Sequence, residues 1–461
     1  MSTFATITTK NNSYPPMKSS YSSSEILTKN GVSFLLPFIL ITTCFAVWGF
    51  ANDMTGPIVK AFSKIFRMSV TEGSLVQVAY YLGYFAMAFP AAMFIQRYSF
   101  KAGVLLGLSL FTIGSLLFLP AKMTGYYAPF LCAYFIFTCG LSFLETSCNP
   151  FIYTMGTEET ATQRLNLAQA FNPIGALLGM FVAMEFVQAR MNPLTTAERH
   201  ALPDAQFNIV KNHDLSILIQ PYIFIGLIAL LLLVLIRINR MPKDGEKPSN
   251  KPLLTSLREL IAQRNYREGV ITQFFYVGAQ VTCWTFIIQY GTRVFMAEGM
   301  DEKSAEILSQ KFNIIAMALF TVSRFICTFF LRYIQPGRLL SILAICAIAF
   351  TGGTIFFPDR NGVYCLVAVS ACMSLMFPTI YGIALRGVGE NVKVAGAGLI
   401  MAILGGSVFP PLQAMIIDAH ITVLGISSTN LSFIIPLISF VVIALYGHRT
   451  YIRHYVLKLK S

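Results

Sequence analysis

One carboxylate, that of Glu145, stands inside a long apolar stretch where it could exchange protons. The stretch from Tyr134 to Tyr153 contains no basic residue and is otherwise almost entirely apolar or small. A charged side chain near a bilayer centre is costly, so such residues usually face a bundle interior or a water-filled path. The alternative is a buried acid that neighbouring hydroxyl groups, such as those of Thr146 and Ser147, satisfy.

A second acid, Asp53, lies late in the first apolar stretch. Burial disfavours the charged form of a carboxyl group, so a buried acid can bind and release protons near working pH. If protonation is linked to substrate occupancy, a proton gradient can drive accumulation. Glu145 and Asp53 are therefore candidate proton-coupling residues. Asp53 lies near the end of its span, so it could instead be hydrated or cap a local turn.

Amide side chains recur near Glu145 at helical spacing. Asn166, Gln169 and Asn172 follow one another every three residues and drift slowly round one helical face. Asn149 lies four residues after Glu145, so these two side chains share a face. Amides donate and accept hydrogen bonds, which suits a hydroxyl-rich ligand. The alternative for each amide is a hydrogen bond that joins two membrane helices.

Gln273, Tyr276 and Gln280 show a related three-then-four spacing. Tyrosine and tryptophan rings offer flat apolar faces that suit the C–H face of a sugar ring. A phosphate or carboxylate substrate would call for several inward Lys or Arg residues, but only Arg324 is deep in a span. The pattern therefore favours a neutral polyhydroxyl solute.

The elements that must position these residues are membrane-spanning helices. The 461 residues are 55% hydrophobic and only 12% charged, half the usual charge of a soluble domain, which is about 25%. The apolar runs are continuous and lack the alternation of a transmembrane β-barrel. At roughly 20 residues a span, the sequence predicts an all-α membrane protein with twelve spans. The predicted spans are 31–56, 73–96, 102–120, 125–154, 163–189, 216–237, 268–292, 305–331, 338–357, 361–385, 394–418 and 424–447.

A basic linker divides the chain into two halves of six spans. We expect a disordered cytoplasmic tail (1–30), an N-terminal domain (31–237), a cytoplasmic linker (238–267), a C-terminal domain (268–447) and a basic tail (448–461). Weak internal repetition of Gly, Ala and Pro between the halves is typical of secondary transporters. The net charge of +13 follows from Lys and Arg in cytoplasmic loops, a bias that places both termini inside.

Other functional classes lack their signatures in this sequence. Nine cysteines lie mostly in apolar runs without a C-x-x-C pair, and the five histidines have no ligand spacing, so no metal is expected. There is no phosphate-binding loop and no nucleophile elbow. A membrane enzyme acting on a lipid-linked sugar would need a charged cluster at the membrane surface, which the loops lack. We therefore expect no enzyme activity, no cofactor and no nucleic-acid partner.

Several stretches resemble the major facilitator superfamily, and within it the fucose–galactose–hexose symporters. They are WGFAND at 48–53, LGYFAMAFPAA at 82–92, FLETSCNPF at 143–151, RLNLAQAFNPIGA at 164–176, QFFYVGAQVTCWTFI at 273–287 and FPTIYGIALRGVG at 377–389. The resemblance implies two six-helix, pseudo-symmetric halves with alternating access. It also implies proton-coupled import of a free sugar by a monomer in a bacterial inner membrane, with H+ as the coupling ion.

The resemblance also assigns roles and shows a departure. Glu145 matches the protonatable glutamate of the family, and Gln169 and Asn172 match its sugar-contacting amides. The full expected set of substrate-binding residues is Gln169, Asn172, Asn149, Asn52, Tyr276, Gln280 and Phe377. Fucose symporters carry an essential aspartate where this chain has Gly56, and Asp53 lies one turn earlier, roughly 4.5 Å along the axis. Phe377 likewise replaces a tyrosine, so glucose or galactose stays open beside L-fucose, as does a sodium-coupled or facilitative carrier.

Overall fold

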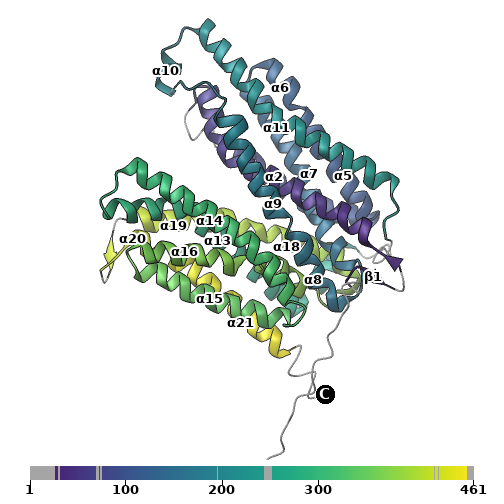
Figure 1. Cartoon of the computed structure of the whole chain (residues 1–461). Coiled ribbons are helices and arrows are strands. Elements are labelled where there is room, and N and C mark those ends of the chain that lie inside the picture. The colour runs from purple at the N-terminus through teal and green to yellow at the C-terminus, as the bar shows by residue number, and fades with distance from the viewer. Residues whose placement is uncertain are drawn as a thin grey trace, which may run out of the picture.

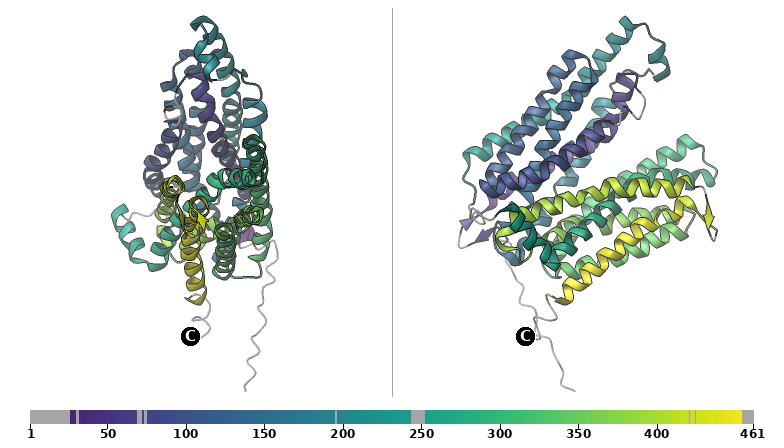
Figure 2. Two further views of the ribbon diagram at one scale, coloured as in Figure 1. Left: turned by 90° about the vertical axis from the view of Figure 1, so that its left-hand side faces the viewer. Right: turned by 180° about the vertical axis from the view of Figure 1, so that it is seen from behind.

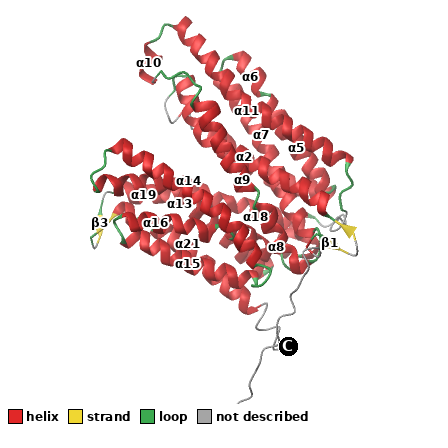
Figure 3. Cartoon of the chain, viewed as in Figure 1, coloured by secondary structure: helices red, strands yellow, loops and turns green. Residues whose placement is uncertain are grey.

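The computed structural model describes residues 26–29, 32–68, 72, 75–194, 196–242, 252–419, 421–423 and 425–453. Most of the predicted N-terminal tail, the middle of the linker and the end of the basic tail lie outside these ranges. The described chain is almost entirely helical (Figure 3). Eleven of its helices are long and apolar enough to cross a membrane, which agrees with the predicted all-α membrane class. The second predicted span corresponds to a 23-residue helix, Leu75–Arg97, several of whose side chains are outside the description.

The first half of the chain forms one bundle and the second half forms another (Figure 1). The helices of the first bundle are α2 (Leu35–Ile65), α4 (Leu75–Arg97), α5 (Phe100–Leu116), α6 (Phe118–Thr124), α7 (Tyr127–Thr154), α8 (Glu158–Gln169), α9 (Asn172–Val182), the π-helix η1 (Ala183–Gln188), α10 (Thr196–Ala201) and α11 (Asp204–Ile238). A short hairpin of β1 (Thr28–Lys29) and β2 (Val32–Ser33) precedes α2. Helix α12 (Leu253–Ala262) lies in the linker.

The second bundle contains the remaining elements. They are α13 (Arg264–Ala297), α14 (Glu302–Phe330), α15 (Pro336–Phe356), α16 (Arg360–Met373), α17 (Met376–Ala384), η2 (Gly389–Asn391), α18 (Val392–Met401), η3 (Ala402–Leu404), α19 (Gly405–Asp418), α20 (Ser428–Leu431) and α21 (Ile434–Tyr451). The strands β3 (Thr422–Val423) and β4 (Ile426–Ser427) pair in a hairpin between α19 and α20.

The two bundles form a V that is open at one end (Figures 1 and 2). Helix α10 and the β3–β4 hairpin lie at the open end, whereas the start of α2 and the end of α21 lie at the closed end. At the closed end α18 packs on α4 and α7, and α17 and α14 pack on α8. The apolar core of the first bundle accordingly continues into the second, through buried residues such as Tyr381 and Leu399.

Close helix contacts in the first bundle depend on glycine. A Cβ on Gly175 would lie 1.9 Å from the Ala46 carbonyl oxygen, and one on Gly179 would lie 2.3 Å from that of Phe50. Gly175 and Gly179 therefore let α9 approach the backbone of α2, as small residues four apart do in membrane helices. This contact sets the position of α9 beside α2.

The structure adds helical order to the segment 190–215, which lies between two of the predicted spans. Helix α11 begins at Asp204 and extends well beyond its apolar part. Asp214 and Arg199 are both fully buried and form an ion pair of 2.7 Å, and the Asn192 N–H also donates to Asp214. Polar contacts thus contribute to the order of this segment, and hydropathy does not register them.

Proline interrupts two of the predicted spans. Span 163–189 divides into α8, α9 and η1, with Pro173 in the first turn of α9. Span 361–385 divides into α16 and α17, with Pro378 in the first turn of α17. Proline has no N–H and its ring clashes with the carbonyl four residues earlier, so each break leaves one carbonyl without its helical partner. Those carbonyls belong to Gln169 and Ser374.

Candidate functional site

Glu145 is buried on α7, with 6% of its surface exposed. The Tyr84 hydroxyl of α4 hydrogen-bonds to its carboxyl group. The neighbouring hydroxyls do not play the satisfying role that sequence alone left open. Ser147 donates to the Phe143 carbonyl, and the Thr146 hydroxyl has no hydrogen-bond partner among the described residues. The acid is therefore held by a tyrosine from another helix.

Two amides connect Glu145 to α8. Asn149 donates from Nδ2 to the Glu145 carbonyl at 2.9 Å, and its Oδ1 accepts from Gln169 Nε2 at 2.7 Å. Both amide side chains are almost fully buried. The structure thus links the Glu145 backbone, Asn149 and Gln169 by two hydrogen bonds. The shared face of Glu145 and Asn149 was predicted from their spacing, whereas the bond from Gln169 to Asn149 was not.

The other predicted residues of the first bundle are on α2 or contact it: Asn52 and Asp53 belong to α2, and Asn172 begins α9. Asn172 donates to the Phe45 carbonyl at 3.3 Å, and the exposed Asn52 accepts a hydrogen bond from Tyr80. Asp53 is half-buried, and within the described part of the chain it makes no hydrogen bond or ion pair. No hydrogen bond among the described residues joins Asp53 to Glu145.

Two of the predicted residues of the second bundle, Tyr276 and Phe377, meet at the junction of α13 and α17. Tyr276 is fully buried and donates to the Met373 carbonyl at 3.1 Å. The Phe377 ring lies 6.2 Å from the Tyr276 ring and 6.3 Å from that of Tyr381, between centroids. Phe377 packs against the apolar cores of both bundles, and Gln280 is half-buried one turn beyond Tyr276. Phe377 is therefore placed between the halves.

Arg324 on α14 is a residue whose role the sequence reasoning missed. Its Nε donates to the Ser374 carbonyl at 2.5 Å and its Nη1 donates to the Gln169 carbonyl at 2.8 Å. These are the two carbonyls that Pro378 and Pro173 leave free. The signal was present as a lone arginine deep in a span, with a proline four residues after each carbonyl, but only the fold brings the three segments together.

Gln273 and Tyr381 carry buried polar atoms with no hydrogen-bond partner in the part of the chain that the structure describes. Gln273 is fully buried, and neither amide atom is hydrogen-bonded among the described residues; the same holds for the Tyr381 hydroxyl. Tyr381 interacts electrostatically with Glu145. Buried polar groups nearly always have partners, so such atoms indicate a place that a ligand, water or another conformation completes.

Asn166 serves a different purpose from the amides that it accompanies in sequence. Its Nδ2 donates to Thr379 Oγ1 of α17 at 3.1 Å, which joins the two bundles at the closed end. Nearby, the Gly387 N–H donates to Glu158 at 3.3 Å. For Asn166 the interhelical hydrogen bond that sequence left as the alternative is what the structure shows.

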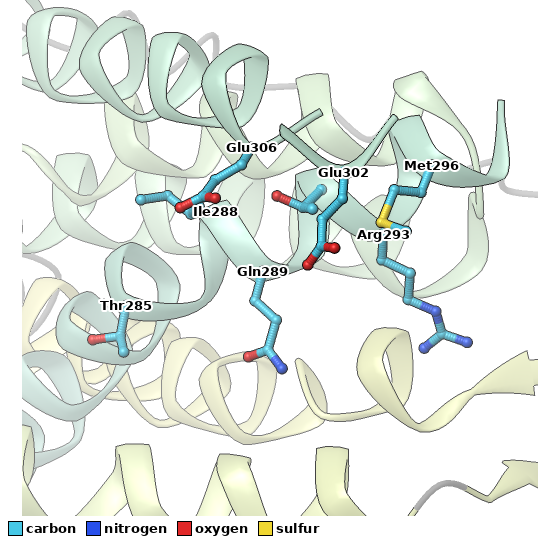
Figure 4. Close-up of a pocket in the computed structure, with 8 residues that line it drawn as sticks. Thr285, Ile288, Gln289, Arg293, Met296, Glu302 and Glu306 are labelled. Atoms are coloured by element: carbon cyan, nitrogen blue, oxygen red, sulfur yellow. The ribbon is translucent and has the colours of Figure 1, made fainter. Parts of the chain in front are cut away.

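A wide pocket of about 600 Å³ lies in the second bundle, near the open end (Figure 4). The side chains that line it come from α13 and α14: Thr285, Ile288, Gln289, Thr292, Arg293, Met296, Glu302 and Glu306. Arg293 hydrogen-bonds to Thr429, while Glu302 and Glu306 have no ion-pair partner among the described residues. Glu306 precedes Arg324 by about five helical turns, so the two residues lie on the same face of α14.

No group of three or more His, Cys, Asp or Glu side chains that could hold a metal ion occurs among the described residues. The nine cysteines are all free thiols. The polar groups described above are therefore carboxyl, amide, hydroxyl and guanidinium groups, which bind protons and hydroxyl-rich molecules.

Comparison with known proteins identifies the family. The family model described as Major Facilitator Superfamily matches residues 40–411. The chain is 46% identical to the L-fucose-proton symporter of Haemophilus influenzae over 429 residues, 91% of this chain and 97% of that protein. It is 31% identical to the L-fucose-proton symporter of Escherichia coli, covering 84% and 88%, and 31% identical to a glucose/galactose transporter of Brucella abortus, covering 88% and 92%.

A solved structure shows the same architecture. The crystal structure of a Major Facilitator Superfamily transporter, FucP, in the outward conformation matches with a TM-score of 0.81 at 29% identity, covering 90% of this chain and 99% of that one. The proton:xylose symporter XylE shares the fold alone, with a TM-score of 0.61 at 14% identity. The twelve-span pattern, the two packed bundles and these matches agree: the chain belongs to the Major Facilitator Superfamily, a family of membrane transporters.

Proposed function

We propose that the chain is a proton-coupled symporter that imports a free neutral monosaccharide by alternating access. The observation that carries this proposal is the buried group of Glu145, Asn149 and Gln169. It places an acid that can exchange protons one helical turn from Asn149, and Asn149 is hydrogen-bonded to Gln169; both amides can bind hydroxyl groups. L-fucose is the first candidate substrate, because two relatives are named L-fucose-proton symporters. Glucose and galactose follow, because another relative is named for them.

The mechanism follows from the position of Glu145. A protonated carboxyl group is neutral and suits the low-dielectric interior, whereas the ionised form is costly there. Sugar bound to Gln169 and Asn149 stabilises the arrangement in which Glu145 is protonated. In that arrangement the two halves can close at the open end and open at the other end. Release of the proton on the other side weakens the site and releases the sugar. H+ is the coupling ion in this scheme, and no other cofactor takes part.

The orientation in the membrane is part of the proposal. Basic residues concentrate in the segments on the side of both termini, as in cytoplasmic loops of multi-pass proteins. With both termini in the cytoplasm of a bacterial inner membrane, the open end of the V faces outward. The similarity to a transporter in the outward conformation supports this orientation. We propose that the working unit is a monomer, with one site between its two halves.

The test is uptake of labelled L-fucose, D-glucose and D-galactose into proteoliposomes of the purified protein. A pH gradient, acid outside, should drive accumulation of at least one sugar, and a sodium gradient alone should not. Glu145→Gln should abolish accumulation but leave sugar exchange in part. Glu159→Gln, an exposed acid at the closed end, is the matched control and should behave as wild type.

Three results would change the proposal. Accumulation driven by sodium without any response to pH would replace proton coupling by sodium coupling. Exchange without accumulation under any gradient would make the protein a facilitative carrier. Normal accumulation by Glu145→Gln would remove Glu145 from the proton step.

A further inference from the structure

Arg324 makes the hydrogen bond that joins α14 of the second bundle to the break in the first bundle. Only 3% of its surface is exposed, and among the described residues no carboxylate pairs with it. A buried charge must be compensated by hydrogen bonds, because its removal from water is costly. The Ser374 carbonyl, the Gln169 carbonyl and the face of the Phe320 ring, 4.5 Å away, supply that compensation.

Both carbonyls are available for one reason. Pro378 and Pro173 each follow the accepting residue by four positions, and neither has the N–H that would bond that carbonyl within a helix. The planar guanidinium group presents several donors in a fixed fork, so it can bond two carbonyls at once. One of these carbonyls belongs to the half that carries Arg324, and the other belongs to the opposite half.

The Gln169 carbonyl belongs to the residue whose side chain forms part of the candidate sugar site. Gln169 Nε2 donates to Asn149 Oδ1 at 2.7 Å, and Asn149 follows Glu145 by one turn. Movement of the Gln169 side chain toward a bound sugar therefore acts on the same residue that Arg324 holds by its backbone. The site and the closed end are connected through one residue.

We propose that Arg324 is a clasp that holds the two halves together at the closed end, and that sugar binding at Gln169 loosens it. This deepens the proposed function, on which the sugar-dependent part rests. Without sugar, the clasp favours the state that is open at the α10 end. When the sugar binds the Gln169 side chain, the Gln169 carbonyl moves away from Arg324. The two halves can then separate at the closed end and close at the open end. Arg324 is thus a positioning residue.

The experiment measures the distance between spin labels at Ile209 and Met415, which are exposed on α11 and α19 toward the open end. Wild type without sugar should show mainly the long distance. Arg324→Gln should shift the equilibrium toward the short distance on the order of 10- to 100-fold, the usual range for loss of one conformational coupling. Arg324→Lys keeps the charge but lacks the fork, so it should shift in the same direction by less. Arg267→Gln, an exposed arginine, is the control.

A second variant tests the clasp without removing the buried charge. Pro173→Ala restores an N–H that can bond the Gln169 carbonyl, so it competes with Arg324 and should shift the label distance in the same direction. Pro221→Ala, which changes a proline inside α11 of the same half, is the control and should leave the distances unchanged.

The outcomes are distinct. If both Arg324 variants and Pro173→Ala keep the wild-type distance distribution without sugar, the clasp is refuted. If they shift it but sugar does not alter the wild-type distribution, the coupling of Gln169 to the clasp is refuted. If the distances shift as expected but the wild type transports no sugar, the clasp stands and the proposed function fails.

Discussion

Replacement of Gln273 by leucine, which has a similar size, offers a sharp test of the second half of the site. Gln273 is fully buried on α13, and both of its amide atoms lack a hydrogen-bond partner among the described residues. A buried polar group without a partner costs about 1–3 kcal/mol. Gln273→Leu removes this cost and should raise the free energy of unfolding of the sugar-free protein by about 1–3 kcal/mol.

The same substitution should impair transport, because Gln273 shares a helical face with Tyr276 and Gln280. In the wild type, the Gln273 amide can bond a sugar hydroxyl, or gain a partner when the V closes at its open end and opens at the other. The leucine variant cannot form these hydrogen bonds in that later state. A loss of about 1–3 kcal/mol corresponds to roughly 5- to 150-fold weaker coupling between sugar binding and the conformational change. Resting stability and function should thus change in opposite directions.

The assay is thermal unfolding of the purified protein with and without L-fucose, together with uptake. A ligand that binds only the folded state stabilises it, so wild type should gain stability with sugar. Gln273→Leu should be more stable without sugar and gain less from it. Gln206→Leu, an exposed position on α11, is the control and should change neither quantity. Lower stability of Gln273→Leu without sugar, or an unchanged gain from sugar, would refute the reasoning.

The remaining predictions concern packing, access and the second acid. Gly175→Ala places a methyl group against the Ala46 backbone, where a Cβ would lie at 1.9 Å, so it should lower the unfolding temperature strongly; Gly352→Ala, with open space around it, should not. Glu302→Gln with Glu306→Gln removes two carboxylates from the wall of the pocket between α13 and α14. The change should reduce repulsion of an anionic analogue such as galacturonate, measured as stronger inhibition of sugar uptake. Asp53→Asn should lower gradient-driven accumulation more than sugar exchange; equal loss of both would remove Asp53 from proton coupling.

Much of the site was visible in the sequence because its key spacings are local. Glu145 and Asn149 lie one turn apart on one helix, so periodicity alone placed them on one face, and the structure shows the Asn149 side chain bonded to the Glu145 backbone carbonyl. Asn166, Gln169 and Asn172 were expected to act together, but they have separate partners. The break before Pro173 ends α8 at Gln169, so Asn172 belongs to the next helix and bonds α2. The shared helical face predicted for these three amides therefore does not form, because the helix is interrupted between them.

Hydropathy and helical periodicity are local properties, so they were enough to predict a polytopic helical membrane protein with an acid, Glu145, among amides. The contacts of Arg324, the bond of Asn166 across the two halves and the lack of a hydrogen-bond partner for buried Gln273 among the described residues became visible only in the folded chain. Those facts depend on contacts between residues far apart in the chain. The Arg324 bond to Gln169, for example, joins segments from opposite halves, and no spacing within either segment specifies the other.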